Sequence, residues 1–560
     1  MKGVLQRLTG RGRPIASGRM QPTRILVWPV LAAAFAPSAA FAAPSDPYVV
    51  YTANRFVDGA VVLRTDPAAG TVVDISRNGP QGTMFAAPFD LAVEADGDLL
   101  VADMGTLCTP TQPRCANDGR IIRVDPVTGR QSLLAGGAPL VDPAGLALAP
   151  NGDVYVADNL EADGTGAVIR VDAVSRAQSV VSEGGLLDLP FGILVDRDGS
   201  LVVSNRVLPG ACTNGVAGRL VRIQPAGGSQ QLVSEGPLFR YPLGVALDGA
   251  GRIAYANECG HPALGRVVSD VAQSVLSANT AADRLVTPER LALDPGGDFL
   301  VSDWSLGDGD GGIVKVDSDS GAQSLVRQGA LFNHPMGIAA VVSRAPQARL
   351  VLDPPLVAAG APVRLDASAS SDPEGLRLAY EWDLNGDGVF ELGTANQPST
   401  TAVWRRNGPR TVRVRVNDPH GGRGVARGVV RVDGSTPQIT GLRAGSRVLG
   451  VGRRRVRPAR TAVARRSRRR APRATSVSFT LSERAAVHVT VARLLARSRS
   501  SDARVLTKAG RRGPNSMRLR ARGLRPGRYR LRFGATDAVG HEATERTLAL
   551  RVVRLARRPR

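Results

Sequence analysis

Six aspartate and asparagine residues recur at one position of a repeated apolar segment, where each ends a short run such as LLVAD or LVVSN. The six residues are Asn54, Asp103, Asp158, Asn205, Asn257 and Asp303. If the repeats place them on one rim, their carboxylate and amide oxygens could hold Ca²⁺ or a polar ligand. The alternative is structural, because Asp and Asn side chains often bond the turn that follows a strand. The pattern favours the structural alternative, since all six repeats share the residue.

Two more carboxylates stand in the segments that precede these runs. Four of the six segments read Pro-x-Gly, at residues 143–145, 190–192, 242–244 and 335–337. The other two read Pro88-Phe89-Asp90 and Pro288-Glu289-Arg290. Asp90 and Glu289 therefore join the six strand-end residues as a predicted ligand-binding rim.

The common catalytic motifs are missing from this half of the chain. It contains no Gly-x-Ser-x-Gly, no zinc-type His/Cys spacing and no phosphate loop. Its two histidines are His261 and His334, and a lone loop histidine is usually solvated. The acidic stretch 306–312 lacks the third and fourth ligands of a calcium loop and predicts a turn. We predict no catalytic residue, and the pattern favours a protein that is not an enzyme.

The elements that position these residues are short strands in a long repeat. The six prolines are separated by 55, 47, 52, 46 and 47 residues, a period typical of propeller blades. Each unit has a Pro-x-Gly strand, the strand that ends in Asp or Asn, a strand such as GRIIRVD (119–125), and a weaker one such as QSLLAG (131–136). The runs are apolar on nearly every position, as expected for sheets buried on both faces.

The sixth unit is split between distant parts of the chain. HPMGIAAV (334–341) begins a unit that is not continued, whereas YVVYTAN (48–54) and GAVVLRTD (59–66) supply the missing strands. A blade built from both segments closes a circular array and removes exposed sheet edges. We therefore predict an all-β protein with a six-bladed β-propeller over residues 46–342.

The repeat resembles the NHL-repeat and gluconolactonase-like (senescence marker protein-like) propellers, with streptogramin lyase as a further relative. The resemblance rests on Pro-x-Gly-Leu-Ala followed by a Val-Ala-Asp strand. In gluconolactonase-like enzymes it implies a metal held by a Glu, an Asn and an Asp, with the Asp at this strand end. The Asn position here is Ala144, Phe191, Leu243 or Met336. Streptogramin-lyase-like chemistry would need a channel histidine.

The N-terminus and the cysteines indicate export. Arg24, the apolar run 25–36 and the small-residue site 40–42 read as a signal peptide over residues 1–42. No later segment is apolar and long enough to span a membrane. In an oxidising compartment we expect two disulfides, Cys108–Cys115 within one loop and Cys212–Cys259 between equivalent loops. The alternative is four free thiols.

Residues 346–433 change in character. VRLDASASSDPEG, AYEWDLNGDG and RTVRVRVNDPHGG resemble the PKD domain, which implies an Ig-like β-sandwich with Trp382 as a core anchor. The stretch from Asp383 to Glu391 also places oxygens at positions 1, 3, 5 and 9 of a calcium loop, with Gly at position 6. The predicted Ca²⁺ ligands are Asp383, Asn385, Asp387, Val389 and Glu391. Position 12 is Thr394 instead of a bidentate Glu, and the alternative is a polar hairpin tip.

Residues 434–560 predict a second, basic β-sandwich, Ig-like or fibronectin-like. Runs such as SVSFTLSE (476–483) and AVHVTVARL (486–494) alternate, as half-buried antiparallel strands do. The segment 443–475 has thirteen Arg and no Asp or Glu, and we expect it to be disordered. Most of the formal net charge of +23 comes from this last third.

The basic segment could bind a polyanion, but it has no interleaved aromatic residues for base stacking, so nucleic acid is disfavoured. Attachment to anionic wall polymers or lipid headgroups is one reading, and a compositional bias towards Arg is the other.

Taken together, the sequence predicts a secreted or cell-surface modular binding protein, with association with the cell wall as one option. Its propeller would bind an extracellular protein or wall polymer, and its sandwiches would act as spacer and attachment modules. The alternative is a metal-dependent hydrolase of lactonase or esterase type, or a lyase, acting in the propeller channel. Ca²⁺ is the one cofactor suggested, and none is certain.

Overall fold

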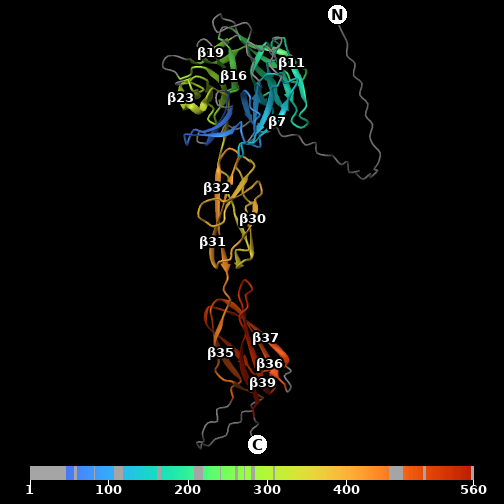
Figure 1. Ribbon diagram of the computed structural model, residues 1–560, viewed down its shortest axis with the longest axis vertical. Coiled ribbons are helices and arrows are strands. Elements are labelled where there is room, and N and C mark those ends of the chain that lie inside the picture. The colour runs from blue at the N-terminus through green and yellow to red at the C-terminus, as the bar shows by residue number, and fades with distance from the viewer. Residues whose placement is uncertain are drawn as a thin grey trace, which may run out of the picture. The chain divides into compact units, whose positions relative to one another are not determined.

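A computed structural model gives the arrangement of the chain (Figure 1). It describes residues 46–55, 60–80, 82–105, 118–159, 165–206, 218–236, 238–239, 241–258, 263–269, 272–278, 284–306, 309–452, 471–495 and 500–555. The predicted signal peptide and all four cysteines of the predicted disulfides lie outside the described residues.

Residues 48–342 form six four-stranded antiparallel sheets. The first three sheets contain β24 (Pro335–Val342), β1 (Tyr48–Asn54), β2 (Val61–Asp66) and β3 (Thr71–Arg77); β4 (Pro88–Val93), β5 (Leu99–Asp103), β6 (Arg120–Val124) and β7 (Gln131–Gly136); β8 (Pro143–Leu148), β9 (Val154–Asp158), β10 (Ala167–Val171) and β11 (Gln178–Glu183). The next three contain β12 (Leu189–Val195), β13 (Leu201–Arg206), β14 (Arg219–Ile223) and β15 (Gln230–Glu235); β16 (Pro242–Leu247), β17 (Ile253–Asn257), β18 (Ala263–Ser269) and β19 (Ala272–Ala278); β20 (Pro288–Leu293), β21 (Phe299–Asp303), β22 (Gly312–Val316) and β23 (Gln323–Gln328). One 3-10 turn, η1 (Ala330–Phe332), precedes β24.

The six sheets close into a ring, as predicted. The innermost strands β4, β8, β12, β16, β20 and β24 each contact the next, and β24 contacts β4 again. The closing sheet joins both ends of the region, because β24 pairs with β1 with Thr52 opposite Ile338. Figure 1 shows the blades arranged around a common centre, from blue through green to yellow. This is a six-bladed β-propeller.

Burial explains why the strand sequences run apolar without alternation. The second strands β5, β9, β17 and β21 are buried at every position. Their two faces pack against the neighbouring blades on either side, which requires apolar residues on both. The outermost strands instead include exposed residues, as in β7 and β11. The most regular segments of the sequence therefore occupy the interior of the ring.

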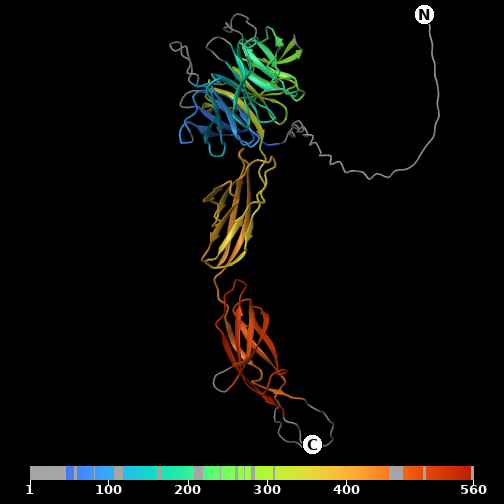
Figure 2. The same ribbon diagram turned by 90° about the vertical axis from the view of Figure 1, so that its right-hand side faces the viewer.

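The rest of the described chain forms two β-sandwiches (Figure 2). The first has a sheet of β25 (Val351–Asp353), β27 (Pro362–Asp366) and β30 (Ser399–Val403), and a sheet of β26 (Leu356–Ala358), β32 (Arg423–Asp433), β31 (Gly408–Asn417), β28 (Ala379–Asp383) and β29 (Leu392–Ala395). The second has a sheet of β33 (Ile439–Ala444), β35 (Ala474–Leu481) and β38 (Gly513–Arg520), and a sheet of β34 (Val448–Val451), β40 (Arg546–Arg554), β39 (Gly527–Thr536), β36 (Ala485–Leu494) and β37 (Ser500–Gly510).

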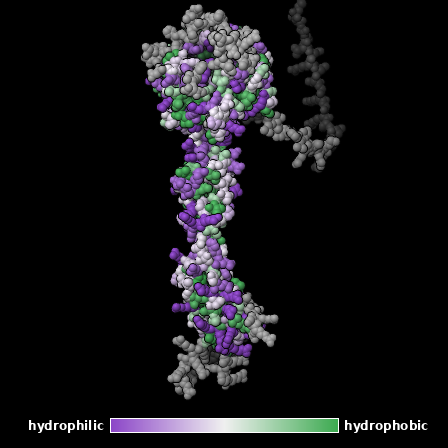
Figure 3. Space-filling view, in the orientation of Figure 1, coloured by the Kyte–Doolittle hydropathy of each residue, from purple (hydrophilic) through white to green (hydrophobic). Residues whose placement is uncertain are grey.

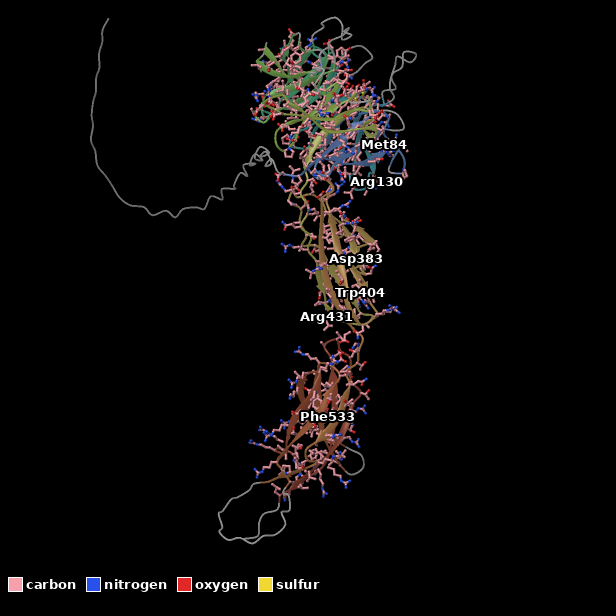
Figure 4. The ribbon with its side chains drawn as sticks, turned by 90° about the vertical axis from the view of Figure 1, so that its left-hand side faces the viewer. Met84, Arg130, Asp383, Trp404, Arg431 and Phe533 are labelled. Atoms are coloured by element: carbon pink, nitrogen blue, oxygen red, sulfur yellow. The ribbon has the colours of Figure 1, made fainter. Side chains whose placement is uncertain are left out.

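The two sandwiches have the same strand order. Each has one sheet of three strands and one of five, and in both the second strand pairs in parallel with the last, as β26 does with β32 and β34 with β40. Trp382 is fully buried in the first core, as predicted. Phe533, labelled in Figure 4, is fully buried in the second.

Part of the basic segment is folded, contrary to the expectation of disorder across 443–475. β34 pairs with β40, and β35 begins at Ala474. Backbone pairing to a buried sheet fixes these residues despite the surrounding charge, because ladder hydrogen bonds do not depend on side-chain polarity. Residues 453–470 lie outside the described part of the chain. Among the helices of the described residues, none is long and apolar enough to cross a membrane.

Candidate functional site: the propeller channel

The predicted strand-end residues do lie at one end of the blades, where they bond the backbone. The carboxylate of Asp103 accepts N–H bonds from Ala86 (2.7 Å), Ala87 (3.1 Å) and Gly105 (3.0 Å). Two of these donors belong to the loop before the first strand of the blade, and the third lies two residues beyond Asp103. The side chain thus fastens two loops of its own blade together.

The other blades repeat this role. Asp303 accepts N–H bonds from Val286, Thr287 and Ser305, and Asp158 accepts them from Val141 and Asp142. Asn205 likewise accepts the Asp188 N–H, whereas Asn257 and Asn54 donate their amide N–H to the carbonyl oxygens of Leu238 and Leu331. Burial raises the pKa of Asp103 and of Asp303, and the backbone N–H groups counteract that rise. These contacts favour the structural alternative over a ligand-binding rim.

A second ring closes the channel. The middle residue of each Pro-x-Gly segment is buried, and the six residues are Phe89, Ala144, Phe191, Leu243, Glu289 and Met336. The five apolar members form one cluster with Ala87 and Met104. The channel is therefore plugged by apolar side chains, with a single carboxyl group among them.

That carboxyl group, on Glu289, has no evident structural partner. The side chain is 2% exposed, and within the described residues its Oε2 has no hydrogen-bond partner. Burial raises the pKa of Glu289 to about 8, and the nearby Glu258 adds to the rise. A buried carboxyl group that remains protonated near neutral pH is a typical feature of a functional site.

The two departures from Pro-x-Gly meet across the channel. Asp90 and Arg290 replace the glycine in their blades, and Asp90 Oδ2 lies 3.6 Å from Arg290 Nε. Arg290 also donates to the Ala144 carbonyl oxygen at 2.8 Å, and Asp90 accepts from Leu146 N–H at 3.0 Å. Both side chains are buried. The glycine positions of two blades have become an ion pair that ties β4, β8 and β20 together.

The mouth of the channel was missed by the sequence reasoning. We assign it to the residue that follows each strand-end residue, and this residue varies between blades, with Arg in two of them: Arg55, Met104, Asn159, Arg206, Glu258 and Trp304. The Arg206 guanidinium lies 3.4 Å from the Tyr241 ring centroid and 3.9 Å from the Glu258 carboxylate. Burial lowers the pKa of Arg206. The sequence contained a signal for these residues, because a position that varies between blades directly follows one that is always Asp or Asn.

Aromatic rings flank these charges. The Trp304 and His334 ring centroids are 4.4 Å apart, and the Arg55 guanidinium lies 5.2 Å from the Phe89 ring centroid. Tyr241 and His334 both have positive φ, of 62° and 56°. That conformation is costly for residues with side chains and is often found at binding sites.

The channel residues do not fit the metal that the gluconolactonase-like resemblance implies. Such a site needs three oxygen ligands that converge on one point. Of the corresponding side chains Glu289 is present, the Asn position is apolar, and the Asp303 oxygens already accept three N–H bonds. Any ion there would have to compete with the bonds that hold the blade.

The predicted calcium ligands of the first sandwich lie in the connection from β28 to β29. Asp383 accepts N–H bonds from Gly386 (2.5 Å) and Gly388 (2.8 Å), and both glycines have positive φ. Asn385 accepts from Asp387, Asp387 from Val389, and Glu391 from Leu384. Figure 4 labels Asp383 beside Trp404, whose indole donates to the Leu384 carbonyl oxygen. The turn is compact, and calcium binding there stays a prediction.

Comparison with known proteins identifies one domain. Residues 343–432 match the PKD domain family, and this part of the chain is a PKD domain. No curated protein matches the sequence.

Several solved structures resemble parts of the chain. The periplasmic gluconolactonase of Pseudomonas aeruginosa is 16% identical over 69% of this chain and 96% of its own, with a TM-score of 0.35. The PKD1 domain of Vibrio anguillarum Epp is 22% identical over 16% and 98%, with a TM-score of 0.14. The fibronectin(III)-like modules of Clostridium thermocellum CbhA are 11% identical over 37% and 95%, with a TM-score of 0.22. Similarity at this level does not define an activity. What the chain is shown to be is a modular all-β protein that contains a PKD domain.

Proposed function

We propose that this is a secreted binding protein whose propeller takes a ligand at the channel mouth. The PKD domain and the basic sandwich serve as spacer and attachment modules. PKD domains are typical of extracellular proteins, which supports the location. The observation that carries the proposal is a contrast within the channel: the shared strand-end residues bond the backbone, whereas the mouth residues vary between blades and include charged and aromatic side chains.

The chemistry of the mouth suits a polar extracellular ligand such as a wall polymer or a protein. The Arg206 guanidinium and the Glu258 carboxylate offer directed hydrogen bonds beside the Tyr241 ring. Trp304 and His334 add a second aromatic surface. Aromatic rings beside charged groups are the usual composition of recognition sites, because they supply contact area and orientation together.

Charge supports a separate role for the last module. Residues 46–342 contain 34 Asp and Glu against 20 Lys and Arg, whereas residues 434–560 contain 5 against 34. An anionic surface would therefore attract the C-terminal module and repel the propeller. Such a surface would hold the protein with its acidic domain free for a partner.

The test is binding of the full chain to a cell-wall fraction and to purified wall polymers. In 0.1 M salt we expect Tyr241→Ala combined with Arg206→Gln to lower ligand affinity at least tenfold, because the stacked pair would be lost. Arg197→Gln is the matched control, since Arg197 is exposed in the β12–β13 turn at the other end of the blade and its side chain donates to the Gly249 carbonyl oxygen. Equal affinities for the two variants would contradict a site at the mouth.

Metal content separates this proposal from a metal-dependent hydrolase or lyase. Asp383→Asn removes a carboxylate from the predicted calcium ligands of the PKD domain. We expect full-length protein with this substitution to hold no divalent ion after dialysis. Its propeller melting temperature should not change with EDTA. About one tightly held ion per chain, with a lower melting temperature on chelation, would overturn the binding proposal in favour of the enzyme.

A further inference from the structure

The C-terminal sandwich contains an open cavity of about 410 Å³. Its floor is made of buried aliphatic side chains that include Val491, Leu519, Leu531 and Leu550. These residues come from both sheets, so the cavity lies between them. It is lined on one side by β37 and on the other by β38, the edge strands of the two sheets.

The PKD domain has a tryptophan at an equivalent position of the same fold. Both sandwiches have a turn aspartate that accepts the N–H four residues on, Asp418 in the first and Asp537 in the second. Counted back six residues from these, Val412 in the PKD domain corresponds to Leu531 in the cavity floor. Trp404, directly after β30, packs on the PKD core and donates to the Leu384 carbonyl oxygen.

The equivalent position of the second sandwich holds a much smaller residue. Ala521 directly follows β38, as Trp404 follows β30. Ala521 is buried, and its side chain is much smaller than the indole at the equivalent position of the PKD domain. The two domains of one topology therefore differ at this position, which lies between the cavity-lining residues Arg520 and Arg522.

Arginines surround the opening. Arg504, Arg518, Arg520 and Arg522 line the cavity, and all four are exposed. Among the described residues none of the four has a carboxylate partner within salt-bridge distance. Residues 471–555 carry nineteen Lys and Arg against five Asp and Glu. Figure 3 shows hydrophilic side chains spread over this domain. An apolar floor beneath unpaired guanidinium groups fits an anionic head with an apolar tail.

We propose that this cavity binds the alkyl chain of a single-chain anionic amphiphile, with its carboxylate, sulfate or phosphate head held by the arginines. The volume lies at the lower end of the range for small-molecule sites, roughly 300–1,000 Å³, which suits one alkyl chain and not two. The inference does not depend on the propeller ligand, and it gives the attachment module a defined partner class.

The test is calorimetric titration of the full chain with hexanoate, octanoate and decanoate, each below its micelle concentration. Affinity should rise about fourfold for each added methylene while the chain still fits the floor. Octyl glucoside, which has the tail without the charge, should bind roughly tenfold more weakly than octanoate. Affinity that does not depend on alkyl length would overturn the proposal, because it would show charge attraction alone.

Two variants sharpen the test. Leu524→Trp should obstruct the cavity, since Leu524 is a partly buried lining residue, and should abolish the length dependence. Arg518→Gln with Arg522→Gln should weaken decanoate binding roughly tenfold. The control is Arg528→Gln with Arg551→Gln, an exposed cross-strand pair of the same domain away from the cavity.

Vesicles of anionic lipid distinguish a surface effect from a filled cavity. If the two arginine pairs lower decanoate binding equally, or if vesicle binding accounts for all affinity and Leu524→Trp leaves it unchanged, the cavity is not the site. Circular dichroism of each variant shows whether the sandwich is still folded, and the length series on the unchanged protein holds independently of any variant.

Discussion

The propeller repeat places two rings of residues at the channel, and the two rings have different roles. The strand-end ring has an Asp or Asn in all six blades, and each bonds the backbone of its own blade. The ring of Pro-x-Gly middle residues is apolar in five blades and carries Glu289 in the sixth. A polar residue that every repeat shares is needed to build each repeat, whereas a polar residue that one repeat has alone is free for a role outside the blade.

The Asp90–Arg290 pair gives the largest expected effect on this comparison. Asp90→Gly restores the repeat pattern in one blade but leaves Arg290 as a buried charge without its partner, which should cost about 3 to 5 kcal/mol of unfolding free energy. Adding Arg290→Gly restores the pattern in both blades. Denaturant unfolding of the double variant should therefore show a smaller loss than the single variant. Additive losses would mean that the two side chains are not coupled.

The strand-end ring predicts the next largest effect. Asp103→Ala leaves three loop N–H groups without an acceptor, and we expect a loss of about 3 kcal/mol in urea unfolding. Asp103→Asn should cost less, because three blades already use Asn. Asp66→Ala is the control, with one exposed turn bond to Ala69 and an expected loss below about 1 kcal/mol. Similar losses for Asp103→Ala and the control would argue against the structural role.

Replacing the glycine of a Pro-x-Gly segment tests how closely the innermost strands pack against one another. A Cβ on Gly145 would lie 2.0 Å from the Phe191 carbonyl oxygen, and one on Gly192 would lie 2.2 Å from that of Leu243. Gly145→Ala should therefore cost about 1 to 3 kcal/mol by overpacking. Gly393→Ala, which meets open space without positive φ, should stay within about 0.5 kcal/mol. Thermal unfolding of both variants makes the comparison.

The raised pKa of Glu289 predicts that the free energy of unfolding changes gradually with pH. Its pKa rises on folding from 4.5 to about 8. Between these values the folded state keeps a proton that the unfolded state has lost, so stability is full below pH 4.5 and falls as pH rises, by about 1.4 kcal/mol per pH unit at most. Glu289→Gln mimics the protonated form and should remove this part of the slope. Identical slopes for the two proteins between pH 5 and 8 would contradict a buried protonated carboxyl group.

Much of the propeller was predictable because its information is local. The apolar runs ending at Asp103, Asp158 and Asp303 match strands that end at those same residues. The split blade followed from counting half-repeats, and the pairing of β24 with β1 confirms it. The burial of Trp382 followed from the resemblance to the PKD domain, and the structure confirms it.

The candidate site was only partly predictable. The sequence singled out Asp90 and Glu289, but it grouped them with six residues that the structure uses to hold loops. Arg290 drew no notice, because its partner lies 200 residues away. Arg206 and Tyr241 were missed because they belong to different blades, and only the packing of neighbouring blades brings them together.

The sequence by itself determined the all-β class, the number of blades and the closure of the ring, because these depend on periodic patterns within about fifty residues. It also determined the PKD domain and the concentration of positive charge in the last module. Only the tertiary structure decided which carboxylates bond the backbone, that Glu289 is buried with no hydrogen-bond partner for Oε2 among the described residues, and that the second sandwich has an open cavity between its sheets. The physical reason is that burial and partner choice are set by residues that are distant in the chain and adjacent only after folding.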